Sequence, residues 1–395
     1  MSRRGPHLLP IGSGQAVLDS LADVLAALDG SGPPIAPYAA GSPPPDLPDL
    51  PLPEDVAFVV STSGSTGLPK RVLLTPDNLL ASAGAAHEVI GGPGAWMLTV
   101  PAHHIAGLQV IVRAALGTGE PTCLDLTAGF TPQAFVAGAL AMPATAYPTF
   151  VSLVPTQLGR LLADPEAADV LAGFDAVLVG GGATSLDVGE QARDRGVRMI
   201  RTFGTTETSG GCVYDGLPLP VSEVYVDNDR HVVLGGATIA CGYLGPRGVL
   251  EDGFSTDADG VRWFRTEDLG RLDESGRLVV TGRADDLINT GGVKVAPGPV
   301  EDALVRYLPG VRDAVVVAVP DPEWGQAVAA AVVLTPRATR PPTVDDARAA
   351  LRGIVPDAAL PRHLHVVDSI PLIGPGKPDR VALSATFSED GRSAG

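Results

Sequence analysis

Lysine is scarce in this sequence of 395 residues. Only Lys70, Lys294 and Lys377 occur among 28 basic residues, so the other 25 are arginine. A lysine ammonium is a compact, flexible point charge, whereas the arginine guanidinium is a planar fork. Each lysine is therefore a candidate functional residue, with biased codon usage as the alternative explanation for the arginine excess.

Cysteine and long apolar runs are also lacking. Cys123, Cys212 and Cys241 lie far apart with no C-x-x-C spacing, which indicates neither a disulfide framework nor a zinc site. No run approaches the ~18 apolar residues of a membrane span, and the basic residues 1–4 lead into no apolar signal core. The sequence thus predicts a cytoplasmic protein without membrane insertion.

The charge balance is acidic, with 45 Asp and Glu against 28 Lys and Arg, a net charge of −17. This excludes nonspecific binding to nucleic acid or to an anionic membrane face, so a polyanionic ligand requires a local site. Hydrophobic residues make up 45% of the chain, enough for the sizeable cores of two or three domains.

The first two thirds of the chain predict an α/β fold with largely parallel sheets. Residues 13–29 have helical spacing, and the nine prolines between Pro33 and Pro53 predict an extended connection rather than a strand or helix. Short apolar runs then alternate with helical patterns. Strands are predicted at residues 56–60, 72–74, 97–100, 122–126, 144–147, 176–179 and 197–202, and helices after residue 77 and at 105–116.

Two further sequence patterns follow residue 208. Short runs punctuated by glycine and aspartate, at residues 224–226, 232–234, 262–264 and 278–280, predict a small barrel-like β subdomain. The remainder predicts a compact α+β domain with helices at 299–308 and 344–354 and strands at 314–319, 327–334 and 364–367. The predicted domains are therefore residues 1–284 and 285–395.

A phosphate-binding loop is predicted after the first strand, at Ser61-Thr62-Ser63-Gly64-Ser65-Thr66-Gly67-Leu68-Pro69-Lys70. Small hydroxyl residues and glycines let backbone N–H groups and hydroxyls face phosphate oxygens, and one ammonium neutralises charge. The P-loop motif does not fit, because Lys70 follows Pro69 and precedes Arg71. A Ser/Gly linker is the alternative, but an apolar strand follows directly.

The loop resembles the signature loop of the adenylate-forming superfamily, which includes acyl-CoA synthetases, peptide-synthetase adenylation domains and luciferases. Six more motifs follow in the family's order, and the resemblance covers most of residues 56–383. They are His103-His104-Ile105-Ala106-Gly107, Gly180-Gly181-Gly182-Ala183, Phe203-Gly204-Thr205-Thr206-Glu207, Thr266-Glu267-Asp268, Gly282-Arg283-Ala284-Asp285-Asp286 and Gly376-Lys377. The resemblance implies a large N-terminal domain and a mobile C-terminal domain.

The resemblance also implies an ATP site. The residues expected to bind ATP or AMP are Ser61, Thr62, Ser63, Gly64, Ser65, Thr66, Gly67, Lys70, Gly181, Gly182, Ala183, Thr202, Phe203, Gly204, Thr205, Asp268 and Arg283. Glu207 and Thr66 are the expected Mg²⁺ ligands, since Mg²⁺ prefers hard oxygen donors. Taken alone, Glu207 is better explained as a solvated loop carboxylate. Phe203 and Glu267 replace the family's tyrosine and glycine, which leaves the backbone geometry at Glu267 open.

Catalysis is assigned through the same resemblance. Lys377, Thr206, Glu207 and His104 are the expected catalytic residues, with Lys377 bridging the attacking carboxylate and the α-phosphate. The C-terminal domain is expected to rotate about Asp285. Rotation presents Gly291, Gly292 and Lys294 to CoA.

The acid site is expected along the helix at 105–116. His104 lines it, and Arg113 is the only charge on this helix, either turned inward to bind a second anionic group or extended to solvent. Ser209, Gly210 and Gly211 leave room for a ring. Residues 208–219 and the short segment before residue 61 resemble compact actinobacterial-type o-succinylbenzoate-CoA ligases of menaquinone biosynthesis, which implies an aromatic dicarboxylic acid as substrate.

The predicted reaction is therefore ATP-dependent formation of an acyl adenylate and then of a CoA thioester. The co-substrates are ATP, Mg²⁺ and CoA, and no tightly bound prosthetic group is expected. The alternatives are another aryl- or acyl-CoA ligase, an enzyme that loads a carrier protein, or a silent nucleotide-binding protein. A metal hydrolase is disfavoured because the histidine pairs lack acidic partners at ligand spacing. The oligomeric state, including a homodimer, stays open.

Overall fold

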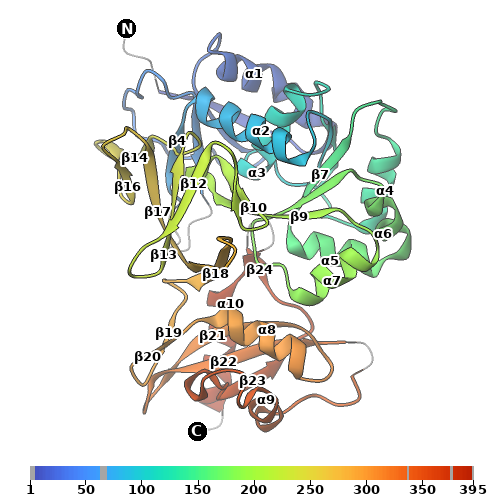
Figure 1. The fold of residues 1–395 in the computed structure, drawn as a ribbon, viewed down its shortest axis with the longest axis vertical. Coiled ribbons are helices and arrows are strands. Elements are labelled where there is room, and N and C mark those ends of the chain that lie inside the picture. The colour runs from blue at the N-terminus through green and yellow to red at the C-terminus, as the bar shows by residue number, and fades with distance from the viewer. Residues whose placement is uncertain (1–4, 63–68, 336–337, 374–376, 394–395) are drawn as a thin grey trace.

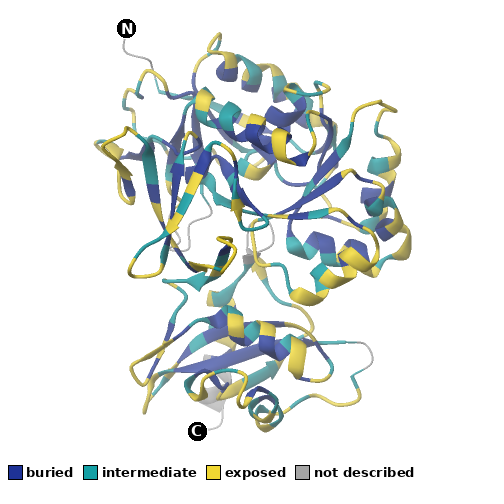
Figure 2. Cartoon of the chain, in the orientation of Figure 1, coloured by how far each residue is buried: buried dark blue, intermediate teal, exposed yellow. Residues whose placement is uncertain are grey.

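The computed structural model describes residues 5–62, 69–335, 338–373 and 377–393. It has a large N-terminal part, in which sheets and helices pack in layers, and a smaller C-terminal part below it in Figure 1. Figure 2 shows that buried residues concentrate in the sheets and on the helix faces that cover them. The predicted mixed α/β fold is confirmed.

A seven-stranded sheet forms the centre of the N-terminal part. Its order is β11-β10-β9-β8-β7-β5-β6, with β5 to β9 parallel and β10 and β11 antiparallel. The bounds are β5 (Ala95–Leu98), β6 (Thr122–Cys123), β7 (Thr149–Leu153), β8 (Ala176–Val179), β9 (Met199–Thr205), β10 (Gly210–Tyr214) and β11 (Leu217–Pro218). The apolar runs arise because helices cover both faces of the parallel strands.

The two faces of this sheet have separate cores. Trp96 and Leu98 belong to the core formed with α1 (Leu21–Asp29), α2 (Pro76–Ile90) and α3 (Ile105–Ala115). Met97, between them in sequence, belongs to the core on the opposite face, as the alternation of side chains along a strand requires. The helices on that face are α4 (Pro132–Leu140), α5 (Pro155–Ala163), α6 (Pro165–Ala172) and α7 (Leu186–Asp194).

A second, six-stranded sheet has the order β1-β2-β3-β4-β14-β15. Strands β1 to β3 are parallel, and β3 and β4 form the antiparallel hairpin whose connection is the predicted phosphate loop. The bounds are β1 (His7–Ile11), β2 (Ile35–Ala39), β3 (Phe58–Ser61), β4 (Arg71–Leu74), β14 (Gly242–Gly245) and β15 (Gly248–Leu250), with the 3-10 turn η1 (Gly14–Ser20) after β1.

An antiparallel five-stranded sheet completes the N-terminal part. Its strands are β12 (Ser222–Val226), β13 (His231–Gly236), β16 (Phe254–Thr256), β17 (Arg262–Leu272) and β18 (Leu278–Arg283). The next sheet begins five residues later and belongs to the α+β C-terminal part. The predicted boundary between residues 284 and 285 thus lies in the connection between two sheets.

The C-terminal sheet has the order β20-β19-β22-β21, with β23 pairing β22. Its long central hairpin carries α8 on one side and α10 on the other, since the residues of β21 and β22 alternate between two cores. The bounds are β19 (Ile288–Thr290), β20 (Val293–Val295), α8 (Pro297–Tyr307), β21 (Val311–Asp321), β22 (Gly325–Leu334), α9 (Val344–Leu351), η3 (Asp357–Ala359), β23 (His363–Val366), β24 (Leu372–Ile373), β25 (Lys377–Pro378) and α10 (Arg380–Ser393).

Two predictions from the sequence are wrong. Residues 144–147 are exposed and form no strand, and the strand β7 begins only after Pro148. The proline-rich segment is not wholly a connection, because β2 lies within it. Of the β2 residues, only Ile35 is paired with β3. Pro37 therefore lies beyond the paired stretch, where no N–H is needed to donate to β3.

Within the described residues, no helix is both long and apolar enough to cross a membrane.

The C-terminal core depends on one arginine at the start of α10. Arg380 Nη1 donates to Glu301 Oε1 and to the Val316 carbonyl oxygen, each at 2.6 Å. Its Nε lies 3.5 Å from Asp286 Oδ2.

We expect Arg380→Ala to lower the free energy of unfolding by about 2 kcal/mol, because it leaves a largely buried carboxylate and a carbonyl without their donor. Urea unfolding followed by circular dichroism measures this loss. Arg340→Ala is the matched control, since the Arg340 side chain, paired with Asp346, is mostly exposed and should contribute less. Equal losses in both variants would contradict the assignment.

Candidate active site

The predicted nucleotide residues gather at the carboxyl ends of neighbouring strands. Ser61 ends β3, Gly180 follows β8, and β9 runs into η2 (Thr206–Thr208), which contains Glu207. In α/β proteins, ligands bind where the carboxyl ends of strands meet. The structure therefore places the start of the phosphate loop, the glycine turn and Glu207 at the carboxyl ends of β3, β8 and β9.

The two ends of the phosphate loop are held together. Thr62 N–H donates to the Lys70 carbonyl oxygen at 2.9 Å, and Lys70 N–H donates to Thr62 Oγ1 at 3.2 Å. These two hydrogen bonds join the residues at the two ends of the loop. The predicted phosphate ligands Ser63, Gly64, Ser65, Thr66 and Gly67 lie outside the described residues.

Tyr243 of β14 connects Lys70 with Glu207. Its hydroxyl donates to Glu207 Oε1 at 2.8 Å, and Lys70 Nζ lies 4.6 Å from the centroid of its ring. Burial and the neighbouring Glu207 carboxylate raise the pKa of Tyr243, so it stays a protonated donor. The sequence analysis missed this residue, because nothing in the sequence around an isolated strand tyrosine points to a loop some 170 residues earlier.

Glu207 is buried but has no cationic partner among the described residues. One of its oxygens accepts the Tyr243 hydrogen bond, which leaves lone pairs for a metal ion. The donor type therefore fits Mg²⁺. No group of three or more potential ligands occurs elsewhere in the described ranges, so such an ion would rely on phosphate oxygens and water for its other ligands.

Two glycines allow close packing in the region predicted to line the adenine. A Cβ on Gly180 would lie 2.3 Å from Thr202 Oγ1, and a Cβ on Gly204 would lie 2.1 Å from the Gly210 carbonyl oxygen. Only glycine fits either position. Thr202, Phe203 and Thr205 are partly buried around them, and Gly181, Gly182 and Ala183 are exposed.

Arg283 contacts both the residue predicted to bind the ribose and the predicted hinge residue. Its Nε and Nη2 each donate to the Asp285 carboxylate at 2.8 Å, and its Nη1 lies 3.5 Å from Asp268 Oδ1. These carboxylates raise the pKa of Arg283 against the opposing effect of its burial. Asp268 and Arg283 are register partners of β17 and β18, which explains why residues 15 apart in sequence meet.

His104 immediately precedes α3, the helix that runs along the predicted acid site. Its backbone is the N-cap of that helix, and its ring centroid lies 4.2 Å from that of His103. Burial lowers the pKa of both imidazoles, that of His103 to about 4. Both rings are therefore neutral at physiological pH.

Arg113 is turned inward, which settles the orientation that the sequence left open. Its side chain is buried, Nη2 donates to Tyr214 Oη at 3.3 Å, and the guanidinium Cζ lies 5.3 Å from the Trp96 ring centroid. No carboxylate pairs with it in the described part of the chain. It is thus a buried cation whose charge is not compensated by an acid.

The segment 209–211 runs past α3. Gly210 has a φ of 94° and faces Ile105 and Gln109 of the helix, and a Cβ on Gly211 would lie 3.2 Å from Tyr214 Cε1. Ser209 is fully buried, and its hydroxyl donates to the Thr238 carbonyl oxygen at 2.9 Å. Its hydroxyl is therefore committed to the fold, while Gly210 packs against α3 and Gly211 against Tyr214 without side chains of their own.

The remaining predicted residues lie in the C-terminal part. Lys377 opens the short strand β25, and its side chain lies outside what the structure describes. Lys294 is exposed on β20, next to the turn formed by Gly291 and Gly292, both with positive φ.

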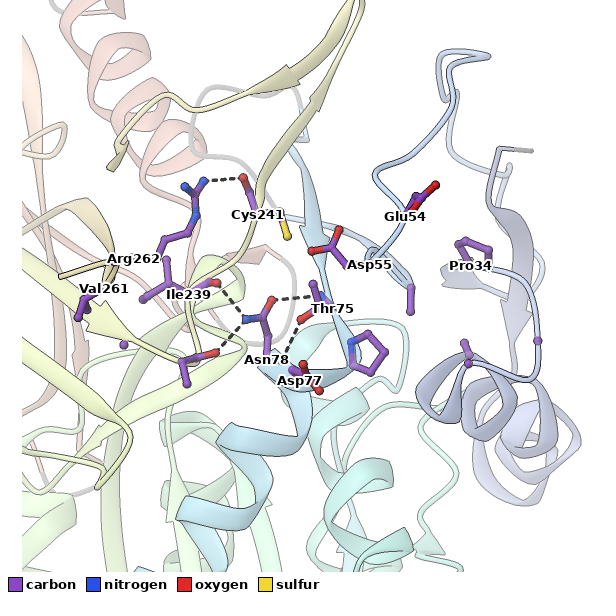
Figure 3. A pocket seen from close by; sticks show the side chains of 18 residues that line it. Pro34, Glu54, Asp55, Thr75, Asp77, Asn78, Ile239, Cys241, Val261 and Arg262 are labelled. Carbon is purple, nitrogen blue, oxygen red and sulfur yellow. Dashed lines mark hydrogen bonds between the residues drawn. The ribbon is translucent and has the colours of Figure 1, made fainter. Parts of the chain in front are cut away.

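A pocket of about 640 Å³ lies elsewhere, between α1, the start of α2 and residues 236–241 (Figure 3). The Asn78 side chain lines this pocket and donates to the carbonyl oxygens of Ala237 and Ile239. None of the predicted site residues lines it.

Known families and proteins resemble this chain along most of its length. The model of the AMP-binding enzyme family matches residues 13–238, and that of the AMP-binding enzyme C-terminal domain matches residues 299–377. The chain is 44% identical over 337 residues to a probable 2-succinylbenzoate-CoA ligase of Mycobacterium tuberculosis, which covers 85% of each. It is 30% identical to the 2-succinylbenzoate-CoA ligase of Listeria monocytogenes, over 84% of this chain and 70% of the relative.

Solved structures agree on the fold. The o-succinylbenzoate CoA synthetase of Bacillus subtilis, in complex with an acyl-adenylate intermediate, has a TM-score of 0.74 at 22% identity, over 96% of this chain and 88% of that one. The match of the first family model alone spans more than half of the sequence, and the motifs, the sheets and the positions of Glu207, Asp268 and Arg283 are consistent with it. The chain therefore belongs to the family of AMP-binding enzymes.

Proposed function

We propose that this enzyme is a 2-succinylbenzoate-CoA ligase of menaquinone biosynthesis. A carboxylate oxygen of the acid attacks the α-phosphorus of ATP and pyrophosphate leaves. The CoA thiolate then attacks the acyl carbon and AMP leaves. The observation that carries the substrate assignment is the buried Arg113, which has no acidic partner among the described residues.

A buried charge is costly unless it is paired. Arg113 therefore favours a substrate with a second anionic group, and 2-succinylbenzoate is a dicarboxylate with an aromatic ring. The related ligases of Mycobacterium tuberculosis and Listeria monocytogenes are named for this acid.

The distance along α3 also suits this acid. Arg113 follows His104 by nine residues, about 13 Å of helix at ~1.5 Å per residue. Side chains on a helix tilt toward its N-terminus, so the long arginine side chain shortens the separation between the guanidinium and the level of His104. A Cβ on Gly210 would lie 3.5 Å from Gln109 Cγ and 3.8 Å from Ile105 Cγ1, so the glycine segment runs beside the stretch of α3 between His104 and Arg113, where we place the aromatic ring.

The nucleotide end of the site uses the remaining groups. Lys70 and the phosphate loop bind the triphosphate, Asp268 accepts hydrogen bonds from the ribose hydroxyls, and Phe203 packs against the adenine. Glu207 would hold Mg²⁺, which would supply positive charge to the phosphates. Tyr243 orients Glu207 by its hydrogen bond and is a positioning residue.

The C-terminal domain supplies Lys377 for adenylation. We place the hinge at Asp285, where the sheet of β17 and β18 ends and a new sheet begins. After rotation, Lys294 and the turn of Gly291 and Gly292 face CoA. Another aryl-CoA ligase, or an enzyme that transfers the acyl group to a carrier protein, would use the same first step but differ in the acid or the thiol.

We expect pyrophosphate release with 2-succinylbenzoate in preference to benzoate or medium-chain fatty acids. Arg113→Met should lower kcat/KM for 2-succinylbenzoate by about 100-fold or more, because one carboxylate loses its buried charged partner. The KM for ATP should change little. Arg160→Met is the matched control, since the one described acceptor of Arg160 is the Phe130 carbonyl oxygen on the opposite face of the sheet. Turnover of a monocarboxylic acid at a higher kcat/KM would refute the substrate.

The two half-reactions test the role of Lys377. Lys377→Ala should slow pyrophosphate release by about 100-fold or more, because the ammonium offsets charge that develops in the transition state. Thioester formation from supplied 2-succinylbenzoyl adenylate and CoA should persist, since the α-phosphate is no longer attacked. Rapid-quench assays of each half-reaction separate these effects. An equal loss in both would show that Lys377 supports the fold rather than adenylation.

A further inference from the structure

Arg113 and three other buried side chains, from four different elements, form one cluster. Besides the contacts of Arg113 with Tyr214 of β10 and Trp96 of β5, the ring centroids of His87, on α2, and Trp96 lie 6.3 Å apart. The exposed fractions are 7% for His87, 1% for Trp96, and 4% each for Arg113 and Tyr214. The cluster thus lies in the interior, between the helices and the sheet.

Three polar atoms of this cluster have no hydrogen-bond partner in the described part of the protein. They are Arg113 Nε, Trp96 Nε1 and His87 Nε2. Buried polar groups are paired in the great majority of cases, and each unpaired group costs free energy. Three such atoms on side chains that contact one another indicate a shared ligand rather than three independent defects.

The charges of the cluster match one anion. Burial and the charge of Arg113 lower the pKa of His87 to about 4, so its ring is neutral. Burial raises the pKa of Tyr214, so its hydroxyl keeps its proton and can donate while it accepts from Arg113. Arg113 is therefore the one charged group of the four, and a single carboxylate balances it.

The cluster borders the glycine segment beside which the proposed function places the acid. A Cβ on Gly211 would lie 3.2 Å from Tyr214 Cε1, so the Tyr214 ring borders the glycine segment directly. The Arg113 guanidinium donates to the hydroxyl of the same ring, so Tyr214 links the cluster to the glycine segment.

We propose that Trp96, Tyr214 and His87 form, together with Arg113, a single binding site for the second carboxylate of the acid and determine its specificity. This inference rests on the proposed function and extends it. The Arg113 guanidinium supplies the charge, the Trp96 indole N–H and the Tyr214 hydroxyl supply neutral donors, and the His87 tautomer with a proton on Nε2 supplies another. Hydrogen bonds to a buried carboxylate are stronger than those between neutral groups.

Kinetics with three acids test the proposal. They are 2-succinylbenzoate, 4-oxo-4-phenylbutanoate, which lacks the ring carboxylate, and 2-butanoylbenzoate, which lacks the chain carboxylate. The analogue that the wild type activates identifies the reacting carboxylate and serves as the reference acid. An analogue that is not turned over is measured by its inhibition constant.

The variants remove one polar group each. Trp96→Phe deletes the indole N–H and Tyr214→Phe deletes the hydroxyl, while both retain an aromatic ring. Trp263→Phe is the matched control, because it makes the same chemical change at an indole that donates to Asp257 on the surface. Thermal unfolding midpoints of all variants report on folding.

We expect each of Trp96→Phe and Tyr214→Phe to lower kcat/KM for 2-succinylbenzoate by about tenfold, the effect of one lost hydrogen bond to a charged group. The same constant for the reference acid should stay within twofold of wild type, and Trp263→Phe should change neither. Equal losses for both acids would show that these side chains only support the core, for example around an internal water molecule. No loss for either acid would equally overturn the proposal.

Failure of the proposed function gives a different pattern. If the wild type does not use 2-succinylbenzoate, or does not prefer it to the reference acid, both the function and this site are wrong. If the wild type prefers it and Arg113→Met abolishes the preference while Trp96→Phe and Tyr214→Phe retain it, the function stands and only the wider site is wrong.

Discussion

The close approach of two backbones at Gly204 and Gly210 is the constraint on which the site depends. No side chain fits at position 204, because its Cβ would lie 2.1 Å from the Gly210 carbonyl oxygen. The contact lets β9, which carries the predicted adenine residues, pair with β10, which borders the proposed acid site. The turn between them holds Glu207. One hairpin therefore fixes the residues proposed to bind nucleotide, metal and acid, and a larger residue at 204 would displace all three groups.

The sequence predicted the groups that occur in contiguous motifs but not those assembled by strand pairing. Buried strands such as β8 were predicted at the observed residues, since their apolar runs are bounded by glycine and polar residues. Tyr243, Trp96 and Tyr214 were missed, because an aromatic residue in an apolar strand is normally a core residue. The strand predicted at residues 144–147 shows the same limit, since an alternating pattern does not reveal that the segment is exposed.

Ion pairs link the predicted ribose residue to the C-terminal part. Arg283 contacts both Asp268 and Asp285, and Asp286, the next residue, lies 3.5 Å from Arg380 at the start of α10. That helix follows Lys377 by only three residues. Asp285 and Asp286, at the predicted hinge, therefore contact two arginines: Arg283, which also contacts the predicted ribose residue, and Arg380, which begins the helix after the predicted catalytic lysine. A contact network of this kind has discrete arrangements rather than a continuous range.

The buried arginine also affects how the protein tolerates heat and mutation. An uncompensated cation in the interior lowers the stability of the folded state, and an anion that binds only the folded chain restores that stability by mass action. Under the proposed binding of the acid to Arg113, the free energy of unfolding of the enzyme would depend partly on the concentration of its substrate. In cells that lack the acid, a larger fraction of the protein would be open to proteases, so the lifetime of the protein would follow the flux through its reaction.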